Sequence, residues 1–448
     1  MATLVFSIWP MASAMNTATR LGRDLRARGH RVVFLGLPDC ADYTEPNGFE
    51  LVPIFARWFP RGSIAAMESE GANVRGLAFL RRVRAFIREM RELTAGLVTG
   101  REREIEEALG ALRPDLLLIS SSSVYPSLPA FFALPQGIPC AYLTTLYPFR
   151  ASPFYPPFTM DLVPSDTALS RARCRLAWAR LLLQNRLRDA ILAAVGLDVD
   201  MRRLFRRLAA ARGLPAGRIR EDGLLAPLLD IPELYVCPRA LDFPGAAPAE
   251  SYLGAAIDLG RGAPDFPWDQ LEGGRPLVYV SLGTYLYLGR KGTLDFLQKV
   301  LDGVGADPRW QLVLAAGDEE VAAGLRVPPG AVMVVRAPQL ALLERASLAV
   351  THGGITTLQE SLYFGVPVVV FPLGFDQPGN AARMVYHGVG VRGNARRATP
   401  AEIRHLIETV LNDPAYTDRA RALGGEVRTE MEAAGWAEAI ERLTARDR

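Results

Sequence analysis

A histidine, two glycines and two threonines follow a short apolar run with a spacing that suits the binding of an anion. The apolar run at 348–351 predicts a strand. A tight turn is expected next, at His352, Gly353 and Gly354, and a helix that begins near Thr356 and Thr357. The first N–H groups of a helix have no intrahelical partner and carry a partial positive charge, and glycines let the backbone approach a ligand. The segment therefore predicts a diphosphate site, to which His352 adds a hydrogen bond. The alternative is that Thr356 is an ordinary N-cap and that the glycines only turn the chain.

Polar side chains continue in the same part of the chain. Glu360 lies one helical turn beyond Thr356, where its carboxylate suits ribose hydroxyls. A second apolar run, 367–371, precedes Asp376 and Gln377, whose acceptors and donors match sugar hydroxyls. Because the carboxyl ends of neighbouring parallel strands share one edge of a sheet, we expect all these groups in one crevice.

Strands and helices alternate along the whole chain. Residues 4–8, 16–28 and 31–37 predict a strand, a helix and a strand, and the same alternation resumes at residue 277. Residues 238–274 are rich in Pro, Gly and Ala and indicate a linker. We predict an α/β protein of two Rossmann-like domains with parallel sheets. The expected units are an N-terminal domain at 1–245, a linker at 246–275, a C-terminal domain at 276–425, and a helix at 426–448 that packs back on the first domain.

Composition excludes several classes of protein. The 448 residues carry a net charge of only +3, which does not favour nucleic acid. The four cysteines lie far apart and form no C-x-x-C pair, so we expect neither a zinc nor a redox motif. No apolar run approaches the ~18 residues of a membrane span. The N-terminus reads as a strand and not as a signal peptide, so we expect a cytoplasmic protein.

One segment, 166–212, is dense in arginine and helical in pattern. We interpret it as a solvated helical face. The alternative is a basic amphipathic surface that makes weak contact with an anionic membrane or an acidic acceptor.

Four segments together resemble the donor-binding signature of family 1 glycosyltransferases, the UDP-glycosyltransferases of secondary metabolism that include bacterial macrolide-type enzymes. They are 278–284, 337–344, 351–360 and 365–380. The resemblance implies a GT-B fold, in which the two domains face each other, and an inverting reaction without a metal or other cofactor. It implies that His352, Gly354, Thr356 and Thr357 hold the diphosphate, Glu360 the ribose, Gln339 the base, and Asp376 and Gln377 the sugar. The predicted donor set also includes Gly283, Thr284, Arg336 and Asn380. Arg336 stands where the family often has an aromatic residue, and a guanidinium can also stack on a planar ring.

The residues that usually catalyse the reaction in this family are absent. The family places a His after the first strand and an Asp after a later strand; these positions hold Ala14 and Ser120. Three explanations stay open. The acceptor needs no strong base, as with an amine, a thiol or an acidic hydroxyl. Another group serves, for which the candidates are Glu68, Glu70, Asp161 and Asp166. Or the chain binds a nucleotide sugar without turnover.

The leading expectation is transfer of a hexose from a nucleotide sugar, with UDP favoured over dTDP, to a small lipophilic acceptor in natural-product or antibiotic biosynthesis. First-domain residues with apolar or aromatic side chains are the expected acceptor walls: Trp9, Met11, Met15, Tyr125, Tyr147 and Phe149. The alternatives are a non-catalytic auxiliary protein that serves a partner transferase, and a nucleotide-sugar epimerase.

Overall fold

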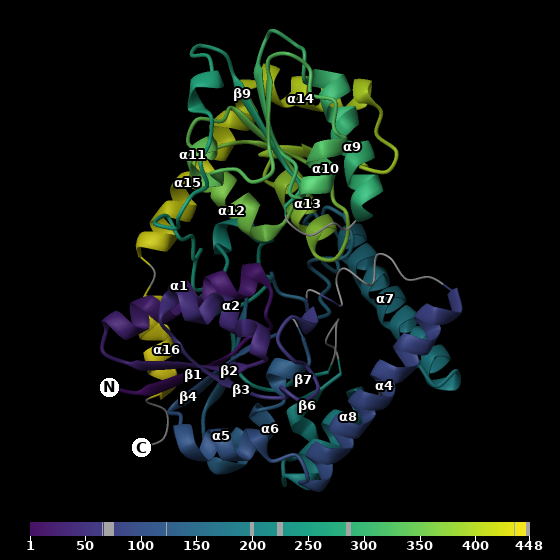
Figure 1. Ribbon diagram of the computed structural model, residues 1–448, viewed down its shortest axis with the longest axis vertical. Helices are drawn as coiled ribbons and strands as arrows, with labels where there is room; N and C mark the ends of the chain where they lie inside the picture. The colour runs from purple at the N-terminus through teal and green to yellow at the C-terminus, as the bar shows by residue number, and fades with distance from the viewer. Residues whose placement is uncertain are drawn as a thin grey trace.

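The computed structural model describes residues 1–64, 66, 76–121, 123–197, 201–221, 227–283, 288–433 and 435–444. Two bodies lie one above the other in Figure 1, the lower built from the first half of the chain and the upper from the second. Each body has a six-stranded sheet at its centre. All the pairings within these two sheets are parallel. The predicted α/β fold with two parallel sheets is confirmed.

The first sheet has the order β3-β2-β1-β4-β5-β8. Its strands are β1 (Thr3–Ser7), β2 (Arg31–Gly36), β3 (Glu50–Pro53), β4 (Leu116–Ser120), β5 (Cys140–Thr144) and β8 (Glu233–Tyr235). The strand order reverses between β1 and β4, so their carboxyl ends open a crevice at the top of the sheet. The loop after β1 leads into α1 (Ala12–Ala27), which starts four residues before the predicted helix.

Helices cover both faces of this sheet, so β1 and β4 are apolar and almost entirely buried. Phe6 and Leu118 face α1, while Val5 and Leu117 face the opposite core. The other helices are α2 (Ala41–Thr44), α4 (Gly76–Thr99), α5 (Glu104–Leu112), α6 (Ala130–Ala133), α7 (Ala168–Ala194) and α8 (Met201–Ala211). A small antiparallel pair joins β6 (Ile219–Arg220) and β7 (Leu228–Leu229).

The second sheet has the order β11-β10-β9-β12-β13-β14. Its strands are β9 (Leu277–Ser281), β10 (Gln311–Ala315), β11 (Ala331–Val334), β12 (Leu348–Thr351), β13 (Val368–Val370) and β14 (Gly390–Arg392). Its helices are α9 (Gly289–Val304), α10 (Glu319–Gly324), α11 (Gln339–Leu343), α12 (Ile355–Tyr363), α13 (Gln377–Tyr386), α14 (Pro400–Asn412) and α15 (Pro414–Glu432). The order reverses between β9 and β12, which places the start of α12 at this sheet's crevice.

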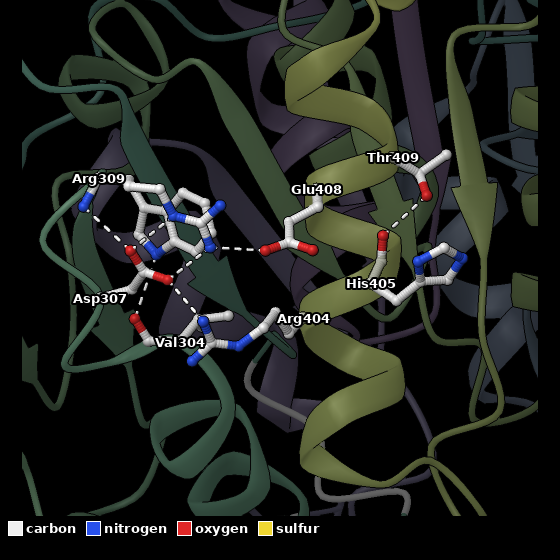
Figure 2. A network of polar contacts seen from close by, with 8 residues as sticks. Val304, Asp307, Arg309, Arg404, His405, Glu408 and Thr409 are labelled. Carbon is white, nitrogen blue, oxygen red and sulfur yellow. Dashed lines mark hydrogen bonds and ion pairs between the residues drawn. The ribbon is translucent and has the colours of Figure 1, made fainter.

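An ion network fixes α14 against the turn between α9 and β10 (Figure 2). The carboxylate of Asp307 accepts hydrogen bonds from Arg309 at 2.7 Å and from Arg404 of α14 at 2.7 Å. The bonds from Arg309 lower the pKa of Asp307 to about 2. Arg309 also donates to Glu408 of α14 at 2.6 Å, so the helix is held at two successive turns. This network lies away from the crevice and stabilises the packing of α14 within the second domain.

The last helix, α16 (Trp436–Thr444), leaves the second body and packs on the first (Figure 1). Its Ala437 and Ile440 are buried in the core beneath α1, and its Glu441 accepts from His30 at 2.9 Å. Residues 426–432 still belong to α15, which packs against α12 and contributes Val427 to the second domain's core. The segment that returns is therefore shorter than the expected 426–448.

Buried contacts also join the two domains directly. Arg383 of α13 donates to Asp242, near the end of the predicted first domain, at 2.6 Å, and both side chains are almost fully buried. The guanidinium lies over the rings of Tyr147 and Phe243. The backbone N–H of Gly379 donates to the carbonyl of Phe158 at 2.7 Å, and a Cβ at Gly379 would lie only 2.6 Å from that oxygen. Any side chain at position 379 would thus separate the domains.

Candidate functional site

The predicted diphosphate segment forms the expected strand, turn and helix. β12 ends at Thr351, Gly353 adopts a positive φ of 89°, and α12 begins at Ile355. The N-cap is Gly354, and no side chain caps the helix. Thr356 is exposed and Thr357 is half-buried, so both hydroxyls lie at the first turn without serving as the cap. The ordinary-cap explanation for Thr356 is therefore wrong, and the positive end of α12 is open to a ligand.

His352 is held between two glycines at the end of β12. A Cβ at Gly283 would lie 2.9 Å from the Cε1 atom of His352, and one at Gly354 would lie 2.6 Å from its Nε2 atom. The ring is only 9% exposed, and this burial lowers its pKa to about 4. At neutral pH His352 is therefore an uncharged imidazole with one N–H to donate. The glycines serve here as spacers for the ring as well as turn residues.

Glu360 and Gln339, the predicted ribose and base residues, lie in contact with each other. Gln339 donates to a carboxylate oxygen of Glu360 at 2.6 Å and accepts from the hydroxyl of Tyr279 at 3.2 Å. Glu360 is fully buried, and both of its oxygens accept from the guanidinium of Arg261, one of them at 2.9 Å. In this structure the two residues predicted to bind the nucleoside, Glu360 and Gln339, thus form hydrogen bonds to other protein groups.

The predicted sugar residues occupy a tight loop and the start of α13. Asn380 donates to Asp376 at 2.7 Å and to the carbonyl of Gly353 at 2.9 Å, which connects the sugar loop to the diphosphate turn. Burial raises the pKa of Asp376 to about 6, against the effect of the Asn380 bond. The side-chain oxygen of Gln377 accepts from the backbone of Leu373 and Gly374, so that atom shapes the loop.

The first domain contacts this loop. Phe375 has a positive φ of 54°, uncommon for a residue with a side chain, and its ring packs against Phe158 of the first domain. Together with the bond from Gly379 to Phe158, this contact fixes the loop only while the domains are docked.

Three predicted donor residues remain: Arg336 and Gly283, which lie in different surroundings from each other, and Thr284, which the structure does not describe. Arg336 is exposed in the loop between β11 and α11. Gly283 has a positive φ of 75° and lies against His352. Thr284 falls outside the described residues.

A cleft of about 530 Å³ separates the two domains at this point. Its walls come from the first turns of α1, from the linker, and from the first turns of α12. The lining residues are Ser13, Asn16, Thr17, Thr19, Arg23, Asn47, Ala256, Asp258, Gly260, Arg261, Gly262, Thr356 and Glu360. The cleft therefore brings the predicted donor residues Thr356 and Glu360 opposite the segment where the family places its base.

Two linker residues in the cleft were missed by sequence reasoning. Arg261 pairs with Glu360, and Asp258 pairs with Arg23 of α1. The composition of this stretch predicted a linker and gave no indication that its side chains would line the cleft. No signal in the sequence singles these two residues out, because the same linker also carries Glu250, Asp265, Asp269 and Glu272.

The positions of the usual base dyad hold no titratable group. Ala14 is buried in the first turn of α1, and Ser120 is buried at the end of β4. Asp161 is exposed and lies 3.6 Å from Arg392 at the domain boundary, and Asp166 is exposed beside Arg171. Neither lines the cleft. Glu68 and Glu70 fall outside the described residues.

The expected acceptor walls divide into two groups. Trp9 stacks on Tyr125 at 5.7 Å, both line a small cavity at the end of β1, and Met11 is exposed nearby in sequence. Burial raises the pKa of Tyr125 to about 12, so its hydroxyl stays protonated. Met15, Tyr147 and Phe149 are instead core residues, at 0%, 3% and 2% exposure. Met15 lies on the buried face of α1, Phe149 joins the main core, and Tyr147 supports Arg383. For these three the structure corrects the expectation, because a large apolar side chain near the end of a strand serves a core as readily as a pocket.

Comparisons with known proteins agree with this architecture. Residues 299–443 match the family model "Erythromycin biosynthesis protein CIII-like, C-terminal domain". The chain is 26% identical to zeaxanthin glucosyltransferase of Pantoea ananas over 90% of this chain and 87% of that protein. It is 30% identical to 4'-demethylrebeccamycin synthase of Lentzea aerocolonigenes over 65% of each chain. The match to the UDP-glucosyltransferase YojK of Bacillus subtilis, 31% identical, spans 42% of that protein.

Solved structures match over the full length. The glycotransferase of kitacinnamycin has a TM-score of 0.68 at 25% identity and covers 99% of both chains. The glycosyltransferase VinC in complex with dTDP has a TM-score of 0.63 at 19% identity and covers 100% of both chains, a likeness of fold.

Two facing Rossmann-like domains, with an open helix N-terminus at the crevice between them, define a glycosyltransferase of the GT-B fold. The chain is a glycosyltransferase that uses a nucleotide sugar, and it is similar to the macrolide and natural-product enzymes of family 1.

Among the described helices, none combines the length and apolar character that crossing a membrane requires. In the same part of the chain, no group of three His, Cys, Asp or Glu side chains is arranged to hold a metal ion.

Proposed function

We propose that this enzyme transfers a hexose from a nucleotide sugar, with UDP favoured, to a nucleophile of a small lipophilic natural product, with inversion at the anomeric carbon. The observation that carries the proposal is the cleft, where Thr356 and Glu360 of the donor side face Ser13 and Asn16 of the first domain. An acceptor held by the first domain would then attack the sugar from the face opposite the departing diphosphate. VinC binds dTDP, so dTDP is the donor nucleotide to be compared with UDP.

The departing diphosphate meets three groups that stabilise negative charge. The open N-terminus of α12 offers N–H groups, the neutral His352 offers one more donor, and Arg261 offers a full positive charge at the cleft wall. Preorganised donors of this kind stabilise charge that develops in the transition state. We propose that they supply this stabilisation without a divalent metal.

Arg261 has a second part in this proposal. It now holds both oxygens of Glu360, and its side chain is 34% exposed toward the cleft. A bound diphosphate would compete for the guanidinium with two negative charges against one. Glu360 would then be released to accept hydrogen bonds from the ribose, while Gln339 keeps its position through Tyr279. Donor binding would thus exchange one partner of Arg261 for another.

Catalysis in this proposal relies on an acceptor that loses its proton readily. Ala14 and Ser120 offer no base, and the cleft acids Asp258 and Glu360 are engaged by arginines. An amine, a thiol or an acidic phenol needs less assistance than an aliphatic alcohol. We therefore expect the rate to follow ionisation of the acceptor across a series of phenols of different pKa, measured by chromatography of the glycosylated product.

The test is isothermal titration of the full chain with UDP, dTDP and GDP. We expect one diphosphate to bind selectively, and we expect the variants Thr357→Ala, His352→Ala and Arg261→Gln each to bind it at least about tenfold more weakly, since each removes a donor to a charged group. Arg396→Gln, an exposed arginine of the second domain, is the matched control and should bind as the wild type. Absence of binding for all three diphosphates would overturn the proposal. Binding without consumption of any nucleotide sugar, even by slow hydrolysis, would favour the auxiliary role.

A further inference from the structure

Helix α7 is unusual in how little of it is buried. It has 27 residues, which makes it about 40 Å long, yet only Ser170, Cys174 and Trp178 are buried. All three lie in its first half. Figure 1 shows the helix at the outer edge of the first domain, where its second half extends from the body of the protein.

A row of large apolar side chains on α7 faces solvent. Leu169, Leu176, Leu183, Leu187 and Ile191 are 63%, 69%, 57%, 55% and 64% exposed. Their spacing of seven, seven, four and four residues keeps them on one face of a helix. Five exposed apolar side chains along one helix face differ from the scattered exposure of single apolar residues that surfaces normally show.

Arginines complete the same row. Arg173 lies four residues after Leu169 and three before Leu176, and Arg180 stands in the same relation to Leu176 and Leu183. Both are exposed, and neither has an ion-pair partner among the described residues. The segment 166–212 contains eleven arginines and four aspartates, a net charge of +7, whereas the whole chain carries +3. The rest of the molecule is therefore slightly acidic, and the positive charge is concentrated here.

We infer that this face of α7 is a docking surface for an anionic lipid membrane, on which the helix lies parallel to the bilayer. A row of leucines with arginines in its first half suits the boundary between headgroups and acyl chains, because leucine inserts while arginine reaches to the phosphates. The first half of the row carries two arginines between its leucines, unlike the charge-depleted centre of a protein interface. A second copy of the chain fits less well, since pairing two such rows would bury four unpaired guanidinium groups against each other.

The test is co-flotation of the full-length protein with vesicles of phosphatidylcholine alone, and of phosphatidylcholine with phosphatidylglycerol at three to one. We expect binding to the anionic vesicles only. The variant Arg173→Glu with Arg180→Glu should bind at least about 30-fold more weakly, because each basic residue contributes about fivefold at such a surface. The variant Leu176→Ser with Leu183→Ser should also lose binding. Because all four side chains are exposed, these variants should retain the wild-type affinity for the nucleoside diphosphate.

The matched control is Arg396→Glu with Arg397→Glu, which makes the same charge change on an exposed loop of the second domain. It should float like the wild type. The inference is overturned if the protein does not float with anionic vesicles, or if the control loses binding as much as the α7 variant. It is equally overturned if the leucine variant dissociates a dimer seen by size-exclusion chromatography, which would assign the row to a second copy, or if an acidic protein occupies it in place of lipid. The vesicle assay is independent of donor binding, so its outcome is separate from that of the proposed transfer reaction.

Discussion

Asp376, a predicted sugar ligand, lowers the stability of the folded protein when it is ionised. Burial raises the pKa of its carboxyl from 3.8 to about 6, so the native protein holds the proton more tightly than the unfolded chain does. The free energy of unfolding is therefore lowered as pH rises from about 4 to about 6, by about 3 kcal/mol in total. A sugar hydroxyl donated to the ionised carboxylate would offset part of that cost, which is a reason to keep the residue in a donor site.

We expect Asp376→Asn to stabilise the free protein relative to the wild type at pH 7.5, by up to about 3 kcal/mol, and to give little change at pH 4. The amide keeps an acceptor for Asn380 and removes the buried charge. Urea unfolding at both pH values measures the difference. Asp269→Asn, at an exposed position, is the control and should show no such pH dependence. An equal effect at the two pH values would contradict the account.

Local structure was predictable at this scale and distant partners were not. The strand, turn and helix around His352, Gly354 and Thr356 were predictable because the three elements adjoin in sequence. The pairing of Arg261 with Glu360 joins positions 99 residues apart, and no local pattern carries that information. Likewise, Met15 is recognisable as a core residue only once α1 is known to begin at Ala12, which places it on the buried face three residues before Ala18, whereas Met11 precedes the helix and is exposed.

The turn between β12 and α12 is built by close packing of glycine and histidine. Gly354 has ordinary backbone angles, φ −61° and ψ 133°, so alanine is allowed by the backbone there. A Cβ would nevertheless lie 2.6 Å from the ring of His352 and would displace it. An alanine at position 354 would therefore test the position of the His352 ring without adding backbone strain.

We expect Gly354→Ala to weaken diphosphate binding at least about tenfold, because the imidazole donor is lost from its position. In the His352→Ala background the same change should cost nothing further, which is the non-additivity of residues in contact. Isothermal titration of the two single variants and the double variant measures this. Gly217→Ala, where a Cβ meets no atom within 4 Å, is the control. Additive losses would show that Gly354 acts on the helix terminus itself.

At the scale of elements, the sequence predicted the fold because both sheets have apolar strands separated by Gly- and Pro-bounded helices. The boundaries were less exact: the first helix begins at Ala12 and the returning helix at Trp436. These limits depend on tertiary packing, as when α15 stays on α12 and only α16 crosses to the first domain.

The two domains are held in register by a buried ion pair. Arg383 and Asp242 are 2% and 1% exposed, and Tyr252 donates to the same carboxylate at 2.6 Å. Removing one member of a buried pair leaves the other charge unpaired in a low-dielectric environment. The end of the first domain is therefore fixed to α13, the helix whose first turn carries the predicted sugar ligand Gln377.

We expect Asp242→Asn to lower the free energy of unfolding by about 3–5 kcal/mol, and Asp242→Asn with Arg383→Met to recover part of the loss because no lone charge remains. Denaturant unfolding followed by fluorescence measures both. The exposed pair of Arg31 and Glu50 is the comparison, and Arg31→Met should change stability by less than about 1 kcal/mol. A loss for the double variant as large as for Asp242→Asn alone would argue that the hydrogen bonds of Asp242, and not its charge balance, matter.

The return of α16 to the first domain has a consequence for recombination between related enzymes. Exchange of whole C-terminal halves is an obvious route to new donor specificities, with a junction in the linker. Such a hybrid would place a foreign α16 against the native surface of α1, replacing the contacts of His30 and Arg28 with Glu441 and Glu438. A hybrid that takes the donor domain alone and restores the chain's own residues 435–444 keeps that surface matched. The first domain and the helix that packs on it are therefore encoded by two separate stretches of sequence. A single crossover cannot transfer both stretches together.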